Sequence, residues 1–248
     1  MTIISSELLQ ATDLVTCGIS TRHGGVSPEP LGMNLSFNVG DAKENVQKNR
    51  ELFFQLLNIG TDRLAIPMQV HSNTVRIAPA PGNYPACDGL ITNVSSVYLC
   101  VSVADCVPIF IVDTARRAVA AIHAGWRGIA ARIVRTGVEM MAHEFDCSPA
   151  NMVAYVGPSA SACCYTVGED VAGRFSSAFV KKSGEEIRVD LKAATVAQLL
   201  ECSIHPGSIE VSPHCTIDAR NLLHSYRRDK ERSGRMMGVI GLREQSIR

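Results

Sequence analysis

Residues 97–128 read V-Y-L-C-V-S-V-A-D-C-V-P-I-F-I-V-D-T-A-R-R-A-V-A-A-I-H-A-G-W-R-G, and this stretch decides the fold. Its runs 97–103, 107–112 and 118–122 are rich in apolar and β-branched residues and are separated by short polar turns. β-branched residues between turn signals are typical of buried strands. The stretch therefore predicts three neighbouring strands in an antiparallel meander.

The sequence outside the meander adds helices and further strands. Gly125 and Gly128 break the strand period, and apolar residues then recur every third or fourth position from Ile129 to about Phe145, which predicts an amphipathic helix. Similar patterns predict strands at 17–21, 152–156 and 237–240, and helices at 41–57 with Asp41 as N-cap, 171–180 and 195–202. Meanders mixed with helices indicate the α+β class rather than a doubly wound sheet.

Length and charge limit the class of protein. The chain has 248 residues, of which 46% are hydrophobic and 19% charged, so it can bury a core of its own. No repeat or long linker divides residues 1–248, and we expect one domain. Lysine plus arginine equal aspartate plus glutamate at 24 each. This balance argues against a nucleic-acid partner, because binding to phosphate backbones requires a basic surface.

The start of the chain and its apolar runs predict a cytosolic protein. The first residues, M-T-I-I-S-S-E, lack the basic and long apolar regions of a secretion signal. The longest apolar run, Val107 to Val112, is far shorter than the roughly 20 residues that span a bilayer, so we expect no membrane partner. The 9 cysteines form no C-x-x-C pair, and the groups Cys163-Cys164 and His214-Cys215 are interpreted as structural.

Three residues near strand ends are candidates for chemistry. His71 ends a strand that begins at Leu64, Cys106 lies in the tight turn A-D-C between two apolar strands, and His123 ends a third strand. Two imidazoles and one thiolate suit a tetrahedral zinc ion and leave one coordination position open for water or substrate. An open position is typical of a catalytic zinc site rather than of a structural one.

The same residue types support other interpretations. Cys106 is equally compatible with a nucleophile that uses His123 as its base and needs no metal. Cys106 is also compatible with a buried turn residue that has no chemical function, since unpaired cysteine is among the most buried residue types. The residues alone leave these alternatives open.

Glycine-rich and charged turns supply candidates for substrate binding. Gly125 and Gly128 permit close backbone approach beside Arg127 at the start of a helix, which suits either an anion or tight packing. Arg22 precedes two glycines in a polar loop that is placed to meet a substrate, although charged loops are commonly only solvated. Asp88, in the segment C-D-G, is equally explained as a turn residue.

Several segments together resemble one bacterial family. They read T-R-H-G-G-V-S at 21–27, Q-V-H at 69–71, A-D-C-V-P at 104–108, H-A-G-W-R-G at 123–128, V-G-P-S at 156–159 and S-Y-R-R-D at 225–229. The family is labelled polyphenol oxidase or laccase-domain protein, and is also described as purine nucleoside phosphorylases that deaminate adenosine. The segments run through nearly the whole chain in order, and A-D-C-x-P with H-A-G-W-R-G makes the resemblance specific.

The resemblance implies a fold, a cofactor and an activity. The fold is a four-layer α/β/β/α arrangement with mixed β-sheets. The cofactor is a catalytic zinc ion held by His71, Cys106 and His123. The activity is phosphorolysis of adenosine, inosine and methylthioadenosine, in which phosphate attacks the ribose, together with hydrolytic deamination of adenosine.

The resemblance also leads us to expect substrate-binding residues. Arg22 and Arg127 are expected to hold phosphate, and Asp88 to orient a ligand or to protonate the purine. Deamination requires a further acid or base that the sequence does not identify, because the His-x-Glu and Pro-Cys-x-x-Cys signature of zinc deaminases is absent.

Two alternatives stand beside this expectation. The family also resembles cysteine hydrolases of the toxin-deamidase type in fold, which keeps Cys106 and His123 as a nucleophile and its base. Copper is the less favoured metal, because a multicopper oxidase needs paired His-x-His motifs and the 7 histidines form none.

Overall fold

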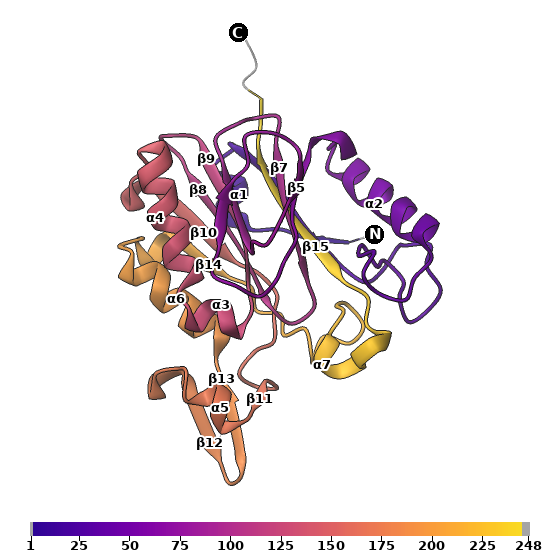
Figure 1. The fold of residues 1–248 in the computed structure, drawn as a ribbon, viewed down its shortest axis with the longest axis vertical. Helices are drawn as coiled ribbons and strands as arrows, with labels where there is room; N and C mark the ends of the chain where they lie inside the picture. The colour runs from indigo at the N-terminus through magenta and orange to yellow at the C-terminus, as the bar shows by residue number, and fades with distance from the viewer. Residues whose placement is uncertain (1, 245–248) are drawn as a thin grey trace.

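Two six-stranded sheets lie face to face in the computed structural model, which describes residues 2–244 (Figure 1). The first sheet contains, in spatial order, β1 (Ile3–Ile4), β2 (Val15–Ser20), β15 (Met236–Leu242), β7 (Tyr98–Val103), β3 (Leu64–Pro67) and β5 (Gly82–Tyr84). The second contains β14 (Ile209–Val211), β10 (Met152–Val156), β8 (Val107–Asp113), β9 (Ala118–Ala124), β6 (Gly89–Thr92) and β4 (Val75–Ile77). Parallel and antiparallel neighbours occur in both sheets, so both are mixed, as expected.

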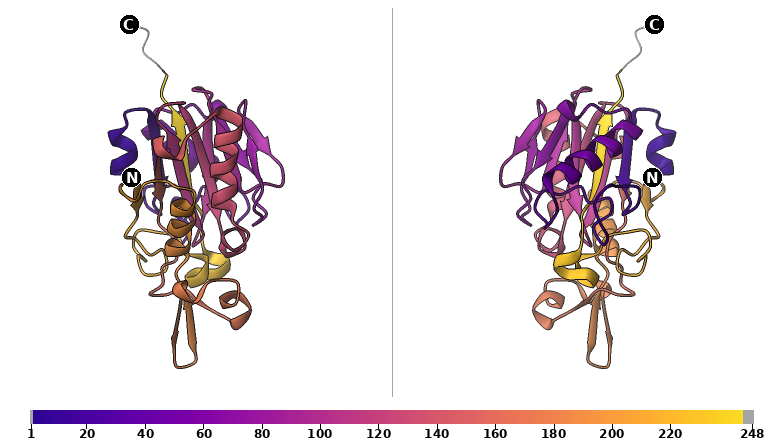
Figure 2. Two further views of the ribbon diagram at one scale, coloured as in Figure 1. Left: turned by 90° about the vertical axis from the view of Figure 1, so that its left-hand side faces the viewer. Right: turned by 90° about the vertical axis from the view of Figure 1, so that its right-hand side faces the viewer.

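The longest helices cover the outer faces of the two sheets. The helices are α1 (Glu7–Ala11), α2 (Lys43–Leu56), α3 (Trp126–Ala130), α4 (Ile133–Phe145), α5 (Glu169–Ala172), α6 (Leu191–Glu201) and α7 (Tyr226–Asp229). Figure 2 shows α4 and α6 in front of one sheet and α2 in front of the other, which confirms the α/β/β/α order. A small third sheet of β11 (Thr166–Val167), β13 (Glu186–Val189) and β12 (Val180–Ser183) projects from one end (Figure 1).

The position of β8 in the core explains its unbroken apolar sequence. Ile109 and Ile111 pack towards α4 in the outer core, whereas Phe110 belongs to the cluster between the sheets. A strand that is buried on both faces needs apolar residues at every position. Phe110 contacts the first sheet at Gly238 of β15, where an added Cβ would lie 2.8 Å from the tip of the ring.

The predicted meander is wrong in its first half. β7 lies in the first sheet beside β15, while β8 and β9 pair with each other in the second sheet. The turn at residues 104–106, which contains Cys106, therefore carries the chain from one sheet to the other. Strands of both sheets are buried on two faces and have the same apolar pattern, so the pattern does not distinguish their partners.

Two of the predicted helices also differ from the structure. The helix expected from Ile129 is interrupted at Arg132, whose φ of 65° separates α3 from α4. The segment 171–180 contains the end of α5, which stops before Gly173, and a short 3-10 helix at Ser177–Phe179, rather than one continuous helix. The helix expected at 41–57 is α2, with Ala42 instead of Asp41 as its N-cap. The helix expected at 195–202 is α6.

The part of the chain from 2 to 244 contains no helix that is long and apolar enough to cross a membrane. The cytosolic location and the single domain over residues 1–248 stay predictions. The absence of a nucleic-acid partner is likewise a prediction.

Truncation of Phe110 tests the contact between the sheets. We expect Phe110→Ala to lower the free energy of unfolding by about 3–5 kcal/mol, because it leaves a cavity between the two sheets. The matched control is Leu56→Ala on α2, where the side chain is 53% exposed, with an expected change within about 0.5 kcal/mol. Urea denaturation measures both values, and similar effects of the two substitutions would contradict this account of the core.

Candidate metal centre

Three separate segments bring His71, Cys106 and His123 together. Cys106 directly precedes β8, and His123 lies in β9 opposite Pro108. His71 lies in a loop rather than at the end of a strand, because β3 ends at Pro67. The ligand atoms of the three side chains nevertheless all lie within 4.8 Å of one another. The structure therefore assembles the three residues that the sequence singled out.

The buried carboxylate of Asp88 positions both histidines. It accepts hydrogen bonds from the backbone N–H groups of Val70 at 3.2 Å, His71 at 2.9 Å and Ser72 at 2.7 Å. Its Oδ1 also lies 2.9 Å from Nδ1 of His123. This contact orients the imidazole ring so that its Nε2 faces Cys106. A carboxylate on the second ring nitrogen is the usual partner of a metal-binding histidine.

These contacts also define the charge state of Asp88. Burial raises the pKa of this carboxyl, but hydrogen bonds from His123 and Ser72 lower it to about 2. Asp88 is fully buried and bonded to protein groups. The surroundings therefore support an orienting role for Asp88 and give it no proton to donate to a purine.

The surroundings of Cys106 favour ionisation of its thiol. Burial raises its pKa, but the charge of His123 and hydrogen bonds from His123 and His71 lower it to about 6. Burial lowers the pKa of His123, but its interactions with Cys106 and Asp88 raise it. A thiolate at neutral pH is the form that binds a metal or attacks a substrate.

The residue at position 125 must be small. An added Cβ on Gly125 would lie 3.1 Å from Cδ2 of His71 and 3.2 Å from Sγ of Cys106.

The rings of His71 and His123 meet edge to face, with centroids 4.9 Å apart. His71 is exposed, Cys106 is half-buried and His123 is 3% exposed, so the group is open to solvent on one side.

The donor set fits a borderline metal ion. Two imidazole nitrogens and a thiolate are the ligand types that zinc accepts, and three protein ligands leave a fourth position open. Metal binding requires a thiolate, which the low pKa of Cys106 favours. The contact of Nδ1 of His123 with Asp88 leaves Nε2 of that ring facing the centre.

Asp105 fastens two loops and helix α7 around the centre, a role that the sequence pattern did not indicate. Its backbone has a φ of 91°, a region that residues other than glycine rarely adopt. Its carboxylate accepts hydrogen bonds from the hydroxyl of Thr216 and the N–H of Arg227, both at 2.6 Å, and its carbonyl accepts from Ala160 at 2.9 Å. The strained turn therefore sets the walls of the site next to Cys106.

Two further cations near the centre were also missed, although Arg227 belongs to the segment S-Y-R-R-D. The guanidinium of Arg227 lies 5.0 Å from the centroid of the Tyr165 ring. Arg235 is close enough to Cys106 and Asp105 for their charges to interact. The centre therefore has positive side chains beside it.

The two arginines expected to hold phosphate differ in their surroundings. Arg127 is exposed, follows Gly125 by two residues and lies over the ring of Trp126 at 4.4 Å. Arg22 donates to a carboxylate oxygen of Glu29 and to the carbonyls of Pro30 and Arg220, each at 3.0 Å. The guanidinium of Arg22 is thus engaged by the protein, and the structure does not support it as a phosphate ligand.

Comparison with known proteins agrees with this geometry. Residues 16–243 match the model of a family described as multi-copper polyphenol oxidoreductase laccase. The chain belongs to this family. It is 31% identical to a Bacillus subtilis protein named purine nucleoside phosphorylase YlmD, over 93% of this chain and 89% of that one. It is 36% identical to a Deinococcus radiodurans protein named purine nucleoside phosphorylase, over 98% and 95%.

Solved structures show the same laccase-family fold. The crystal structure of YlmD from Geobacillus stearothermophilus has a TM-score of 0.89 to this chain, with 32% identity over 93% of this chain and 92% of that one. The Bacillus licheniformis protein YfiH also has a TM-score of 0.89, with 31% identity over 96% and 94%. The arrangement of layers is therefore shared with experimentally determined members.

The donor sets do not match the copper chemistry in the family description. Among residues 2–244, the groups of three metal-ligating side chains contain only His71 and His123 as imidazoles. A multicopper oxidase takes its ligands from several paired histidines. The described residues therefore show no cluster of paired histidines of the multicopper type.

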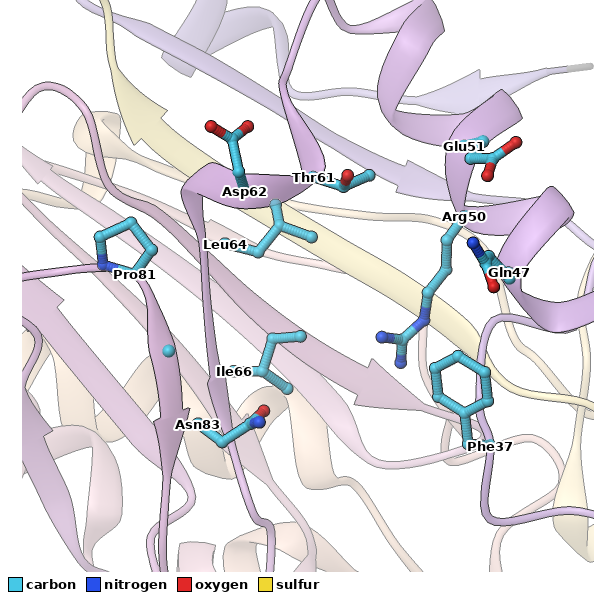
Figure 3. A pocket seen from close by; sticks show the side chains of 11 residues that line it. Phe37, Gln47, Arg50, Glu51, Thr61, Asp62, Leu64, Ile66, Pro81 and Asn83 are labelled. Atoms are coloured by element: carbon cyan, nitrogen blue, oxygen red, sulfur yellow. The ribbon is translucent and has the colours of Figure 1, made fainter. Parts of the chain in front are cut away.

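A separate cavity of about 400 Å³ lies beside α2 (Figure 3). Figure 3 shows Arg50 from this helix reaching towards Phe37, with Asp62 and Ile66 on the opposite wall, and the guanidinium lies 4.4 Å from the Phe37 centroid. None of its lining residues belongs to the three-residue centre. We therefore assign the chemistry to the centre and not to this cavity.

The structure brings together cysteines from the two groups that were interpreted as structural. Cys163, Cys164 and Cys215 lie together, with their Sγ atoms within 4.8 Å of one another. Sequence spacing did not reveal this, because the partners come from loops more than fifty positions apart that meet only in the fold. This group is considered below.

Substitution of Asp88 tests its orienting role. We expect Asp88→Asn to lower affinity for zinc, used as probe metal, about 10–100-fold, because the amide no longer accepts from both the 70–72 loop and His123. The matched control is Asp113→Asn, since Asp113 is also fully buried and accepts from backbone N–H groups, including Ser148, away from the centre. Equilibrium dialysis compares the variants, and unchanged affinity in Asp88→Asn would remove this role.

Proposed function

We propose that this chain is a zinc-dependent purine nucleoside phosphorylase whose active site is the centre of His71, Cys106 and His123. The observation that carries the proposal is the convergence of two histidines and one low-pKa thiol around a buried carboxylate. Relatives with 31–36% identity over nearly the whole chain are named purine nucleoside phosphorylases, which supports the same substrate class here.

The proposed reaction exchanges one bond at the ribose. An oxygen of phosphate forms a bond to C1′, the bond from C1′ to the purine nitrogen breaks, and the purine leaves with its electron pair and takes up a proton. Adenosine, inosine and methylthioadenosine share the purine and the ribose that this chemistry needs. When bound, zinc supplies a Lewis acid with one open coordination position.

The residues around the centre are suited to hold charged substrate groups. Phosphate carries negative charge. Arg127 follows Gly125, which lies against His71 and Cys106, by two residues, and Arg235 is close enough to Cys106 for their charges to interact. We assign phosphate binding to the exposed Arg127, because the guanidinium groups of Arg22, Arg227 and Arg235 donate to protein carbonyls.

Deamination of adenosine is proposed as a second reaction of the same pocket. Water replaces the amino group at C6, and ammonia leaves with the proton that water provides. A zinc site with an open position is the usual means of this chemistry. Asp88 is fully buried and its pKa is lowered, so we assign the proton transfer to another group.

A cysteine hydrolase is the second candidate, and one observation favours it. Cys106, His123 and Asp88 form a chain of contacts in which the carboxylate orients the imidazole and the imidazole faces the thiol. This is the arrangement of an activated nucleophile. It uses the residues of the metal centre and needs no metal, so the two candidates differ in their response to chelation.

Incubation with adenosine and phosphate tests the leading proposal. We expect zinc-loaded protein to release adenine only when phosphate is present, and chelated protein to lose this activity. Cys106→Ala should lower kcat/KM by about 100-fold or more, because it removes a ligand. The matched control Cys202→Ala removes a half-buried thiol directly after α6, outside the centre, and should retain wild-type activity. Chromatography of adenine, inosine and hypoxanthine measures both reactions.

Two results would contradict the leading proposal. Absence of base release from zinc-loaded protein would exclude the phosphorylase. Activity that survives chelation, but is lost when the metal-free thiol is alkylated, would support the cysteine hydrolase instead.

A further inference from the structure

A second group of metal-ligating side chains lies outside the centre described above. Cys163, Cys164 and Cys215 come from two loops, and the thiols of the first two are 3.1 Å apart. The loops are joined by a parallel bridge between Ser159 and Cys215, and the N–H of Thr216 donates to the carbonyl of Ser159 at 3.0 Å. The backbone therefore holds the third thiol against the vicinal pair.

We propose that these three cysteines bind one thiophilic d10 cation, Cu(I) or Zn(II), at a site separate from the candidate active site. Thiolates select soft cations of this kind. Metal–sulfur bonds of about 2.3 Å place sulfur atoms about 3.8 Å apart in a tetrahedral site, and all three Sγ atoms lie within 4.8 Å of one another. Rotation of the exposed Cys163 side chain opens its short contact with Cys164.

Cu(I) and Zn(II) differ in the number of ligands that they need at this site. Among residues 2–244, no fourth histidine, cysteine or carboxylate joins the group. Cu(I) accepts three thiolates without a further ligand, whereas Zn(II) completes its tetrahedron with water. Each thiol releases its proton when its sulfur binds the cation.

A buried positive charge beside the cluster supports thiolates there. Lys192 is 7% exposed, and its Nζ donates to the carbonyls of Ser212 at 2.7 Å and His214 at 2.8 Å. Within the described residues it forms no ion pair with a carboxylate inside 4.0 Å, although its charge interacts with Cys215, Asp190 and Cys163, in that order. A buried ammonium is costly without a neighbouring anion, and a thiolate cluster supplies one.

Backbone donors favour the ionised form of the innermost thiol. The N–H of Ser161 lies 3.5 Å from Sγ of Cys215. Burial raises the pKa of this thiol, but N–H groups of Ser161, Asp218 and Ile217 lower it below its usual value. Cys215 is thus the buried ligand of the group, while Cys163 lies at the surface.

The site is open to an incoming ion. Cys163 lines a cavity of about 600 Å³ together with Lys181, Lys182 and Arg188 of the β12–β13 hairpin. In Figure 1 this hairpin projects from the end of the molecule next to β11, which begins just after Cys164. An exposed thiol at a cavity wall gives the cation an entry path.

Metal uptake by reduced, full-length protein tests the proposal. Protein is titrated anaerobically with Cu(I) in competition with a chromogenic chelator, and separately dialysed against Zn(II) before elemental analysis. We expect wild type to retain one more metal ion per chain than the double variant Cys163→Ser/Cys164→Ser, with either Cu(I) or Zn(II). The cation for which this difference appears is the one that the site binds. Cys106→Ala should keep this extra metal ion, because the sites are separate. The control Cys202→Ser, a half-buried thiol outside both groups, should keep it as well.

Equal uptake by wild type and the double variant with both cations would overturn the proposal. A measurement on wild type alone covers the case in which the variant does not fold. Mass spectrometry of alkylated peptides should show that the bound cation protects Cys163 and Cys164 from iodoacetamide. Unchanged alkylation in the presence of the cation, or oxidation of the pair to a vicinal disulfide instead of binding, would also overturn the proposal.

Discussion

The candidate active site depends on the hydrogen bonds that the buried carboxylate of Asp88 accepts. The carboxylate accepts from the N–H groups of the 70–72 loop and fixes the imidazole of His123, so one group positions both histidines. A buried charge is stable only when it is fully hydrogen-bonded. Loss of either set of donors would leave that charge uncompensated, and the loop of His71 is therefore coupled to the strand of His123. Cys106 completes the group from the turn that directly precedes the neighbouring strand β8.

The two-sheet architecture explains why these segments meet. The chain crosses from β7 in one sheet to β8 in the other at the turn that contains Asp105 and Cys106. The strained backbone of Asp105 persists because its carboxylate and carbonyl fasten the loops at Ala160 and Thr216, and helix α7 at Arg227, to the same turn. The crossing between the sheets and the thiol of Cys106 thus share this turn. The loops at Ala160 and Thr216 also carry the second thiol group.

Local sequence predicted much of the site and less of the topology. The strands at 107–112 and 118–122 and the positions of Cys106 and His123 followed from apolar runs and the turns between them. The partner of β7 did not follow, because pairing between distant strands leaves no local pattern. Asp88 was identified, but its bonds to the 70–72 loop became visible only in the fold. The roles of Arg227 and Arg235, and the contact of Cys215 with Cys163 and Cys164, depend on loops that meet across the sequence.

The central claim is that His71, Cys106 and His123 hold one metal ion, with Asp88 orienting the histidines. X-ray absorption at the zinc edge, on zinc-loaded Cys163→Ser/Cys164→Ser protein, tests it most directly because the second thiol group is then disabled. The account predicts one sulfur neighbour at about 2.3 Å and nitrogen or oxygen neighbours at about 2.0–2.1 Å. A first shell without sulfur, or with two or more sulfur atoms, would contradict it.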